Sequence, residues 1–340
     1  MDTFLFLLTD GITSGAVYGL VALSLVIVHT VTRVANIAQG EYVMFGAMTL
    51  ASFMEHAVPA TLGLVLGGGL LCALFEAWDA RRAPRRLLRI ALTSAIAAAV
   101  LCGAVWLTLA SQSHYVLSLA CSLLLVSALG PVVYRLTVQP GLNSSAVVLV
   151  IISVGVQMVL HGLALILWGA QPRPVPPVST AGFQAGAVFL SAQSLCILAV
   201  SALVMAGLFV FFEFTQVGKA LRATAMNRRG AQLCGISVKR AGLASFALAA
   251  CFSGASGMLV APLVTANVDM GFLIGLKGFV GATFGGLATY PLSIAGVAIV
   301  GSLDSFAAYS LSAYRDAIVF ALILPVLLLR NGPRHQRSDR

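Results

Sequence analysis

Three charged side chains, Glu41, Lys277 and Asp304, fall inside long apolar segments of the sequence. A charge at the centre of a bilayer costs about 2.5–3.5 kcal/mol on insertion scales, so such residues usually face a bundle interior and take part in function. Asn36 and Gln39 place two further polar side chains just before Glu41. We therefore treat these five residues as candidates for lining a path through the membrane.

A purely structural interpretation of the same residues stays open. Asn36, Gln39 and Glu41 can satisfy backbone groups where a broken helix begins. Lys277 and Asp304 can form an ion pair with each other or with Glu41, because opposite charges stabilise one another strongly in a medium of low dielectric constant.

A basic segment, GKALRATAMNRRGAQLCGI at 218–236, separates two long apolar segments. Such a segment must lie in water or against another protein, because a bilayer interior rejects its charges. We interpret it as the contact for a separate motor subunit. Its basic residues, with two that follow it, are Lys219, Arg222, Arg228, Arg229, Lys239 and Arg240.

The signatures of catalysis are missing from the sequence. None of the five histidines belongs to an H-E-x-x-H pair, and SGASG at 253–257 is not a G-x-S-x-G nucleophile elbow. The pair Gly218-Lys219 lacks the spacing of a phosphate-binding P-loop. No two of the six cysteines have the spacing of a metal site. We therefore expect no enzyme activity and no cofactor on this chain.

Composition places the chain in the membrane. Of its 340 residues, 59% are hydrophobic and only 9% are charged, whereas globular proteins carry about a quarter charged residues. A helix needs roughly 20 apolar residues to cross the hydrocarbon core, and the apolar runs are continuous, unlike the alternating strands of a barrel. The prediction is an all-α polytopic membrane protein with a single transmembrane domain, 1–340.

The net charge of +9 is concentrated in three clusters, at 81–89, 219–240 and 330–340. Clusters between apolar spans follow the positive-inside rule and attract anionic lipid headgroups, so membrane lipids are expected partners and nucleic acid is not. We predict that the loop 214–241 and the C-terminus are cytoplasmic. The N-terminus and the Pro-rich loop 170–192 are then external.

About eleven membrane-spanning helices are predicted. Removing the pair within 61–110 would not change the orientation of any other span, so we interpret the pair as an addition to a nine-span core. Small residues at 253–257, at Gly271 and Gly275, and at Gly281 and Gly285 are typical of helix-packing seams, with ligand contact as the alternative. The predicted spans are 11–30, 36–56, 61–78, 90–110, 115–134, 145–169, 193–213, 242–265, 272–289, 292–312 and 315–330.

Two stretches resemble the permeases of branched-chain amino-acid ABC importers of the LivH type. The first, 11–48, contains NIAQGE at 36–41, where the family reads Asn-(Phe/Ile)-Ala-His-Gly-(Glu/Asp). The second, 218–291, includes the family's cytoplasmic loop with its ending AQLCGI, and 134–160 fits more loosely. The chain departs from the pattern at Gln39, which replaces the family's His, and in the extra pair 61–110.

The resemblance implies a multi-pass permease of the inner (plasma) membrane. Its implied partners are ATP-binding cassette subunits that hydrolyse ATP, a second related permease and a periplasmic solute-binding protein. The loop 218–240 would carry a coupling helix that sits in a groove of the ATPase. The residues implied for coupling are Lys219, Arg222, Asn227, Leu233, Gly235 and Ile236.

Two other functions remain as alternatives. The same architecture serves several solutes, so urea, short amides or another small carboxylate can replace branched-chain amino acids. From a different class, a stand-alone secondary transporter or channel would use Glu41, Lys277 and Asp304 as an ion or proton relay. Neighbouring genes for ATPases, a second permease and a binding protein would favour the importer.

Overall fold

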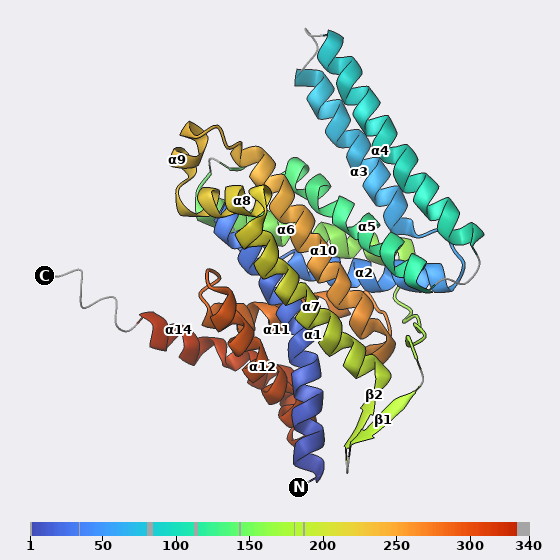
Figure 1. Cartoon of the computed structure of the whole chain (residues 1–340), viewed down its shortest axis with the longest axis vertical. Helices are drawn as coiled ribbons and strands as arrows, with labels where there is room; N and C mark the ends of the chain where they lie inside the picture. The colour runs from blue at the N-terminus through green and yellow to red at the C-terminus, as the bar shows by residue number, and fades with distance from the viewer. Residues whose placement is uncertain are drawn as a thin grey trace, which may run out of the picture.

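The computed structural model describes residues 2–33, 35–79, 84–111, 115–142, 144–179, 181–185 and 188–331, and it is built almost entirely of helices (Figure 1). The longer helices are α1 Asp2–Thr32, α2 Gln39–Met54, α3 Ala60–Asp79, α4 Pro84–Ala110, α5 Tyr115–Val133, α6 Ala146–Trp168, α7 Ala192–Phe214, α10 Val238–Val264, α11 Met270–Phe284 and α12 Tyr290–Ser310. The shorter elements are the π-helix η1 Tyr134–Val138, α8 Gln216–Met226, α9 Arg228–Leu233, the 3₁₀ turn η2 Ser312–Tyr314, α13 Arg315–Ala321, α14 Ile323–Asn331, and the strands β1 Gly182–Ala185 and β2 Val188–Ser191.

The all-α polytopic prediction is confirmed. Among the described residues, eight helices are long and apolar enough to cross a membrane: α1, α3, α4, α5, α6, α7, α10 and α12. The three remaining predicted spans coincide with shorter helices. Of these, α2 has 16 residues and α11 has 15, and the last predicted span is divided between α13 and α14. In α2, every residue from Gln39 to Phe53 is buried, so protein rather than lipid surrounds it.

Helix α1 forms the centre of the bundle. It packs against α12, α10, α11 and α7, and 83% of its most apolar 18-residue window is buried. Helix α2 lies between α10, α11 and α5. The short helix α2, which carries the candidate residues Gln39 and Glu41, is thus held deep in the molecule.

Glycines allow α2 to approach its neighbours closely. A side chain at Gly46 would overlap the backbone of Gly254, and one at Gly257 would overlap the backbone of Val43. On the other side of α2, Gly40 meets Gly271 in the same way. Small residues allow helix backbones to touch in membranes, where no hydrophobic force drives association. The predicted packing seams at 253–257 and at Gly271 are therefore confirmed.

Helices α3 and α4 lie at the edge of the bundle and project beyond it (Figure 1). Only 17% of the most apolar window of each helix is buried. They pack mainly against α5 and against each other. The contacts among the central helices do not depend on this pair.

Opposite ends of the molecule carry the segments that were predicted to lie on opposite sides of the membrane (Figure 1). The start of α1 and the antiparallel pair β1–β2 lie at one end, while α8, α9 and the start of α4 lie at the other. Of the basic clusters that predicted the sides, Arg81, Arg82 and residues 332–340 lie outside the described residues. Which end faces the cytoplasm stays a prediction.

Candidate functional site

The polar residues before α2 form a buried hydrogen-bonded chain. Asn36 Nδ2 donates to Gln39 Oε1 at 3.2 Å, and Gln39 Nε2 donates to Ser253 Oγ of α10 at 2.9 Å. Ser24 of α1 shares a hydrogen bond of 2.8 Å with Ser253. Asn36 and Gln39 are only 2% and 1% exposed. Both amides thus join the start of α2 to α1 and α10 through hydrogen bonds between side chains.

Glu41, two residues after Gln39 in α2, has fewer partners. Its side chain is fully buried, and Gln157 Nε2 of α6 donates to its Oε1 at 3.1 Å. No described residue donates a hydrogen bond to the other oxygen, Oε2, although His161 Nδ1 lies 3.8 Å from it. His161 Nε2 lies 3.6 Å from Asp269 Oδ1, whose side chain is 85% exposed. A row of ionisable groups therefore runs from a buried carboxylate to the surface.

Sequence reasoning missed Gln157, His161 and Asp269. The available signal was the spacing of Gln157 and His161, which are four residues apart and so share one face of a helix. That helix, α6, packs mainly against α2 and η1, and only 17% of its most apolar window is buried. Glu41 is thus covered by a helix that has few other neighbours.

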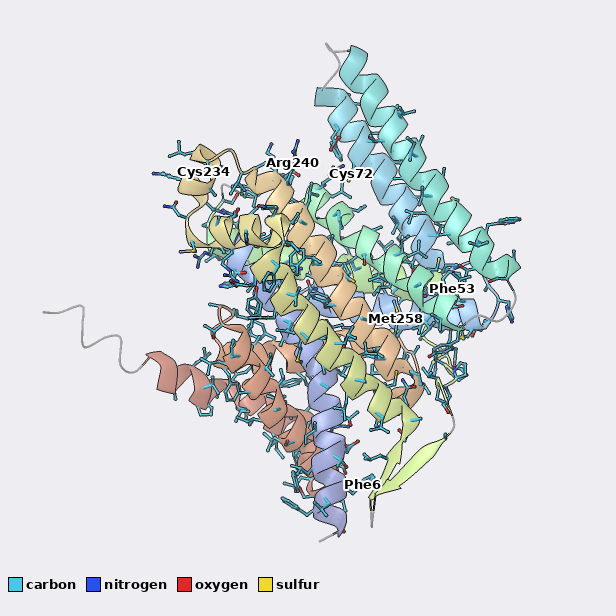
Figure 2. The ribbon with its side chains drawn as sticks, in the orientation of Figure 1. Phe6, Phe53, Cys72, Cys234, Arg240 and Met258 are labelled. Carbon is cyan, nitrogen blue, oxygen red and sulfur yellow. The ribbon has the colours of Figure 1, made fainter. Side chains whose placement is uncertain are left out.

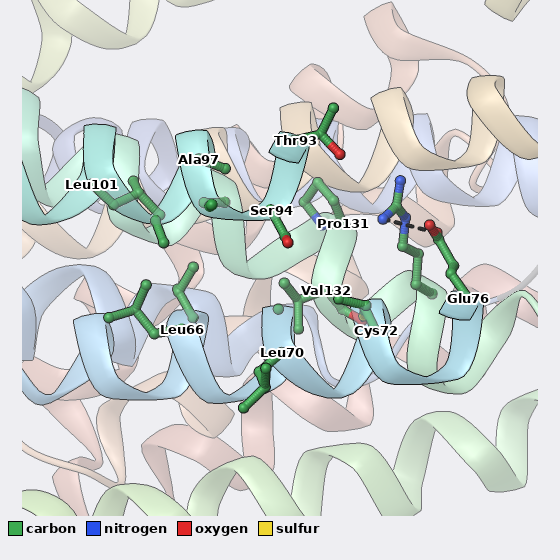
Figure 3. A pocket seen from close by; sticks show the side chains of 17 residues that line it. Leu66, Leu70, Cys72, Glu76, Thr93, Ser94, Ala97, Leu101, Pro131 and Val132 are labelled. Atoms are coloured by element: carbon green, nitrogen blue, oxygen red, sulfur yellow. Dashed lines mark hydrogen bonds and ion pairs between the residues drawn. The ribbon is translucent and has the colours of Figure 1, made fainter. Parts of the chain in front are cut away.

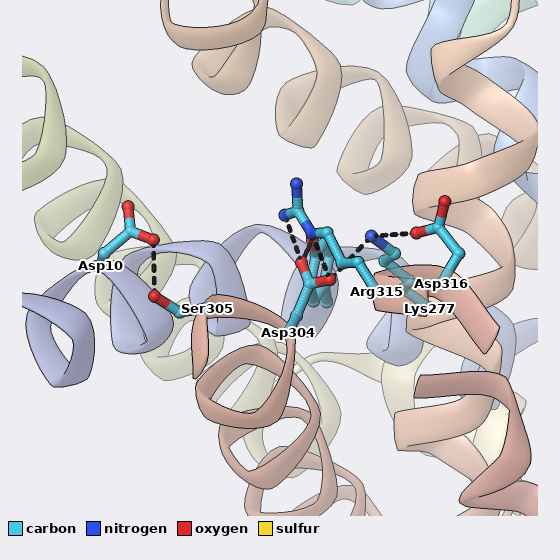
Figure 4. A network of polar contacts seen from close by, with 7 residues as sticks. Asp10, Lys277, Asp304, Ser305, Arg315 and Asp316 are labelled. Atoms are coloured by element: carbon cyan, nitrogen blue, oxygen red, sulfur yellow. Dashed lines mark hydrogen bonds and ion pairs between the residues drawn. The ribbon is translucent and has the colours of Figure 1, made fainter. Parts of the chain in front are cut away.

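Asp304 of α12 stands at the centre of a second charged network (Figure 4). It is fully buried and accepts hydrogen bonds from Tyr18 Oη at 2.6 Å, from Lys277 Nζ at 2.9 Å, and from Arg315 Nε and Nη2 at 2.7 Å each. Lys277 also pairs with Asp316 Oδ1 at 2.9 Å. Two cations and two anions thus alternate, which compensates the desolvation of each charge.

The structure therefore brings together Lys277 and Asp304 but places Glu41 in a separate site. The predicted ion pair between the first two is present. Arg315 and Asp316, the first two residues of the predicted span 315–330, both point into this network (Figure 4). Their hydrogen bonds join α13 to α11 and α12, and Tyr18 adds α1, so the network holds four helices together.

The basic segment 218–236 forms two short helices, α8 and α9, bounded by capping residues. Thr215 Oγ1 accepts from Gly218 N at 3.0 Å at the start of α8, and Asn227 Oδ1 accepts from Gly230 N at 3.0 Å at the start of α9. Polar side chains at these positions satisfy backbone donors that lack a partner in the helix. Asn227 thus creates the bend between the two helices.

The ending AQLCGI stops α9 sharply. Gly235 has φ +80°, a conformation that favours glycine. Its N–H donates to the Gln232 carbonyl at 3.0 Å, and Ile236 N–H donates to the Ala231 carbonyl at 2.9 Å. This pair of bonds is the Schellman motif that ends many helices. Gly235 and Ile236 therefore set the geometry of the exposed tip.

The surface of α8 and α9 combines basic and apolar groups. Helix α8 buries Gly218, Leu221 and Thr224 and packs against α7, α1 and α10. Lys219 and Arg222 are exposed, and Arg222 pairs with Glu213 at 3.0 Å. Exposed apolar side chains accompany them, since Met226 is 81% exposed and Leu233 is 90% exposed. Figure 2 shows Cys234 and Arg240 at this same end of the molecule.

Two arginines connect these short helices to the end of α1. Arg33 Nη2 donates to the Ala225 carbonyl at 2.9 Å, and Arg228 Nη2 donates to the Thr32 carbonyl at 3.2 Å. Hydrogen bonds from charged donors are among the stronger ones in proteins. A displacement of α8 and α9 would therefore act directly on the central helix.

Comparison with known proteins supplies the family. The sequence model of the family described as "Branched-chain amino acid transport system / permease component" matches residues 86–327. The permease LivH of Escherichia coli K12, from a high-affinity branched-chain amino acid transport system, is 24% identical over 96% of this chain and 93% of its own length. BraD of Pseudomonas aeruginosa is 23% identical over 95% of this chain and 92% of its own.

Among solved structures, PsaBC from Streptococcus pneumoniae in complex with Fab aligns with 96% of this chain and 90% of its own, at 12% identity. Its TM-score of 0.38 is too low to establish a common fold. The family match covers most of the chain, and the full-length relatives and the eight apolar helices agree with it. The chain therefore belongs to the family of branched-chain amino-acid transport permeases, multi-pass proteins of the inner membrane.

Proposed function

We propose that this chain is a transmembrane subunit of an ATP-driven importer of branched-chain or related amino acids. It would form the translocation path with a second related permease, receive solute from a periplasmic binding protein, and be driven by separate ATP-binding cassette subunits. Family membership supports the transport role. The observation that carries the coupling proposal is the capped, exposed unit of α8 and α9 with Leu233 at its tip.

Helices α8 and α9 have the properties that a coupling element needs. Exposed Leu233 and Met226 offer apolar surface that a partner would remove from water, which favours association. Neighbouring Lys219 and Arg222 can steer a partner of opposite charge. The hydrogen bonds of Arg33 and Arg228 would then transmit a rigid-body displacement of this unit to α1.

Glu41 is the residue best placed to recognise an amino acid. Its buried carboxylate has one oxygen without a hydrogen-bond donor among the described residues, and the α-ammonium group of an amino acid would supply one. Displacement of α6 would uncover Glu41, Gln157 and His161 together. Urea carries no cation, so this site favours amino acids over the urea alternative.

The secondary-transporter alternative gains less support from the geometry. A proton or ion relay through Lys277 and Asp304 needs groups that can exchange partners, whereas Asp304 already accepts from three side chains. The network joins four helices, which favours a role in stabilising the fold. Glu41 lies outside it and cannot complete the proposed relay.

Coupling can be tested with the complete transporter in proteoliposomes. The chain is co-purified with the ATPases, second permease and binding protein encoded beside it, and ATP-dependent uptake of labelled leucine and of labelled urea is measured. We expect leucine uptake that requires ATP. Leu233→Asp should abolish ATPase co-purification and uptake, and Gly235→Arg and Arg222→Glu should weaken both.

Cys234→Ser, a conservative change beside Leu233, is the matched control and should behave as the unmodified chain. Membrane insertion of every variant is checked by extraction and size-exclusion chromatography. Solute accumulation without ATP by the purified chain alone would refute the importer. Normal ATPase co-purification by Leu233→Asp would refute only the coupling surface.

A further inference from the structure

Two buried polar atoms lie close together between α2 and α6 without bonding to each other. Glu41 Oε2 and His161 Nδ1 are 3.8 Å apart, and neither has a hydrogen-bond partner among the described residues. That separation is longer than a hydrogen bond. Buried polar atoms in proteins nearly always have a partner, so this pair has hydrogen-bonding capacity that the described side chains do not use.

Hydrogen bonds on both sides of His161 hold α6 against α2 and the residues that precede it. Ser153 Oγ accepts from Ile37 N at 3.0 Å, and Trp168 Nε1 donates to Ser52 Oγ at 2.9 Å. Because one contact precedes His161 along α6 and the other follows it, they fix the position of His161 relative to α2. The short distance between the two unpartnered atoms is thus a product of how α6 is attached.

Each group of the pair is held by one atom and has another left for a ligand. Gln157 Nε2 donates to Glu41 Oε1 at 3.1 Å, and Asp269 Oδ1 lies 3.6 Å from His161 Nε2. A carboxylate only accepts, so Glu41 Oε2 requires a donor, whereas an imidazole that carries a proton on Nδ1 donates from that atom. The His161 side chain is 25% exposed and that of Asp269 is 85% exposed, which places the pair close to the surface.

An α-amino acid carries the complementary pair of groups on one carbon atom. Its ammonium group donates and its carboxylate accepts. Covalent geometry sets the ammonium nitrogen roughly 2.7–3.6 Å from the carboxylate oxygens, close to the 3.8 Å between Glu41 Oε2 and His161 Nδ1. Hydrogen bonds between charged groups are among the stronger ones. One residue of α2 and one of α6 can therefore bind both charged groups of the same solute.

A cavity elsewhere in the molecule is less suited to such a solute. It encloses about 720 Å³ between α3, α4 and α5 (Figure 3). Its lining is mostly apolar, and the charged side chains at one end, Glu76 and Arg135, pair with each other at 3.1 Å. Because these two charges already compensate each other, the cavity offers little to a molecule with two charged groups.

We propose that His161 binds the carboxylate of the transported solute while Glu41 binds its ammonium group. This assignment rests on the proposed transport function and adds the requirement that the solute carries both groups. A solute bound to both residues bridges α6 and α2, whereas an amine or a carboxylic acid reaches only one of them. His161 would thus make the permease select α-amino acids from compounds with a single charged group.

The test measures which half of the solute each residue recognises. The membrane complex of both permeases and the ATPases is purified without the binding protein, and its thermal unfolding midpoint is followed against solute concentration. Leucine carries both charged groups, 3-methylbutylamine carries only the ammonium group, and 4-methylpentanoate carries only the carboxylate. We expect leucine to bind the unmodified complex about tenfold more tightly than either analogue.

Variants of the two residues should respond differently to these solutes. His161→Leu should lower the affinity for leucine about tenfold and leave that for 3-methylbutylamine unchanged, because the amine has no carboxylate. Glu41→Gln should lower the affinity for both. His161→Gln restores an N–H donor and should recover part of the affinity for leucine.

Ser153→Ala is the matched control on α6. It removes the hydrogen bond from Ile37 N and so loosens the attachment of the helix without changing Glu41 or His161. The preference for leucine over 3-methylbutylamine should stay that of the unmodified complex.

Three binding results would overturn the proposal. These are equal affinity of the unmodified complex for leucine and 3-methylbutylamine, no stabilisation by leucine, and equal losses for both solutes in His161→Leu, which would indicate a structural role. Uptake by the complete transporter separates this failure from that of the transport function. Absence of ATP-dependent leucine uptake refutes the proposed function, whereas normal uptake together with one of these binding results refutes only the role of His161.

Discussion

Glu41 and Asp304 are both fully buried carboxylates in an apolar bundle, yet their surroundings differ. Asp304 accepts hydrogen bonds from Tyr18, Lys277 and Arg315, so its charge is compensated several times. Among the described residues, only Gln157 donates a hydrogen bond to Glu41, and His161 lies 3.8 Å from it. A charge with every partner in place stabilises one arrangement of helices. A charge with fewer hydrogen-bond donors around it can bind a ligand instead.

This difference predicts opposite effects of removing each charge. Loss of the Asp304 charge should damage the fold, whereas loss of the Glu41 charge should damage transport in a folded protein. The four substitutions that follow separate the two outcomes, from the largest expected effect to the smallest.

Asp304→Asn should have the largest effect. It leaves the cations of Lys277 and Arg315 without their shared anion, and breaking a buried ion pair costs about 3–5 kcal/mol. We expect a clear fall in the thermal unfolding midpoint in detergent and a lower yield of folded protein. Asp10→Asn, which alters only the 2.8 Å bond from Ser305, is the control. An unchanged unfolding midpoint for Asp304→Asn would show that this network does not stabilise the fold.

Glu41→Gln should slow transport and leave the fold intact. The amide keeps the size of the side chain but no longer attracts an ammonium group, and a hydrogen bond to a charged group contributes about 1.5–3 kcal/mol. We therefore expect an initial rate of leucine uptake reduced about tenfold or more, with a normal unfolding midpoint. A fully active variant would assign Glu41 a purely structural role.

Gln157→Leu should give an intermediate effect on transport. It removes the one described hydrogen bond to Glu41 Oε1 without changing any charge, and a typical net contribution of about 1 kcal/mol corresponds to about fivefold in rate. Met158→Leu, a neighbour whose side chain is 67% exposed, is the control for uptake assays. A loss as large as that of Glu41→Gln would mean that Gln157 itself contacts the solute.

Asp269→Asn should have the smallest effect. Its side chain is 85% exposed and lies 3.6 Å from His161, and exposed ion pairs contribute only about 0–1 kcal/mol. Leucine uptake should fall by less than about fivefold. A larger loss of uptake would show that His161 and Asp269 take part in transport together with Glu41.

The sequence predicted the buried charges but not all of their partners. Glu41, Lys277 and Asp304 were found because a charge in an apolar run is rare, and the pairing of the last two was among the expected arrangements. Arg315 and Asp316 were missed as network members because they follow a break between helices, and only the fold turns them inward. His161 was missed because the histidines were considered only as members of a metal-binding pair, and the spacing of four residues between Gln157 and His161 was not used.

The ends of individual helices were more predictable than the positions of the helices relative to one another. The breaks around α8 and α9 follow from capping by Asn227 and from the turn at Gly235, which depend on neighbouring residues only. The short length of α2 was not predictable, since burial by α10 and α11 removes the need to span the bilayer. The position of α3 and α4 at the edge of the bundle was not predictable either, because it depends on how the two helices meet α5.

The glycine contacts around α2 have a consequence for movement during transport. Backbones that touch at Gly46 and Gly254, and at Gly40 and Gly271, leave no room for one helix to slide or rotate against the next. Helices α2, α10 and α11 therefore move together as one rigid unit. A path that opens first to one side of the membrane and then to the other must open along the outer surface of that unit. Helix α6, with its few neighbours, is the part of that boundary that can shift most easily.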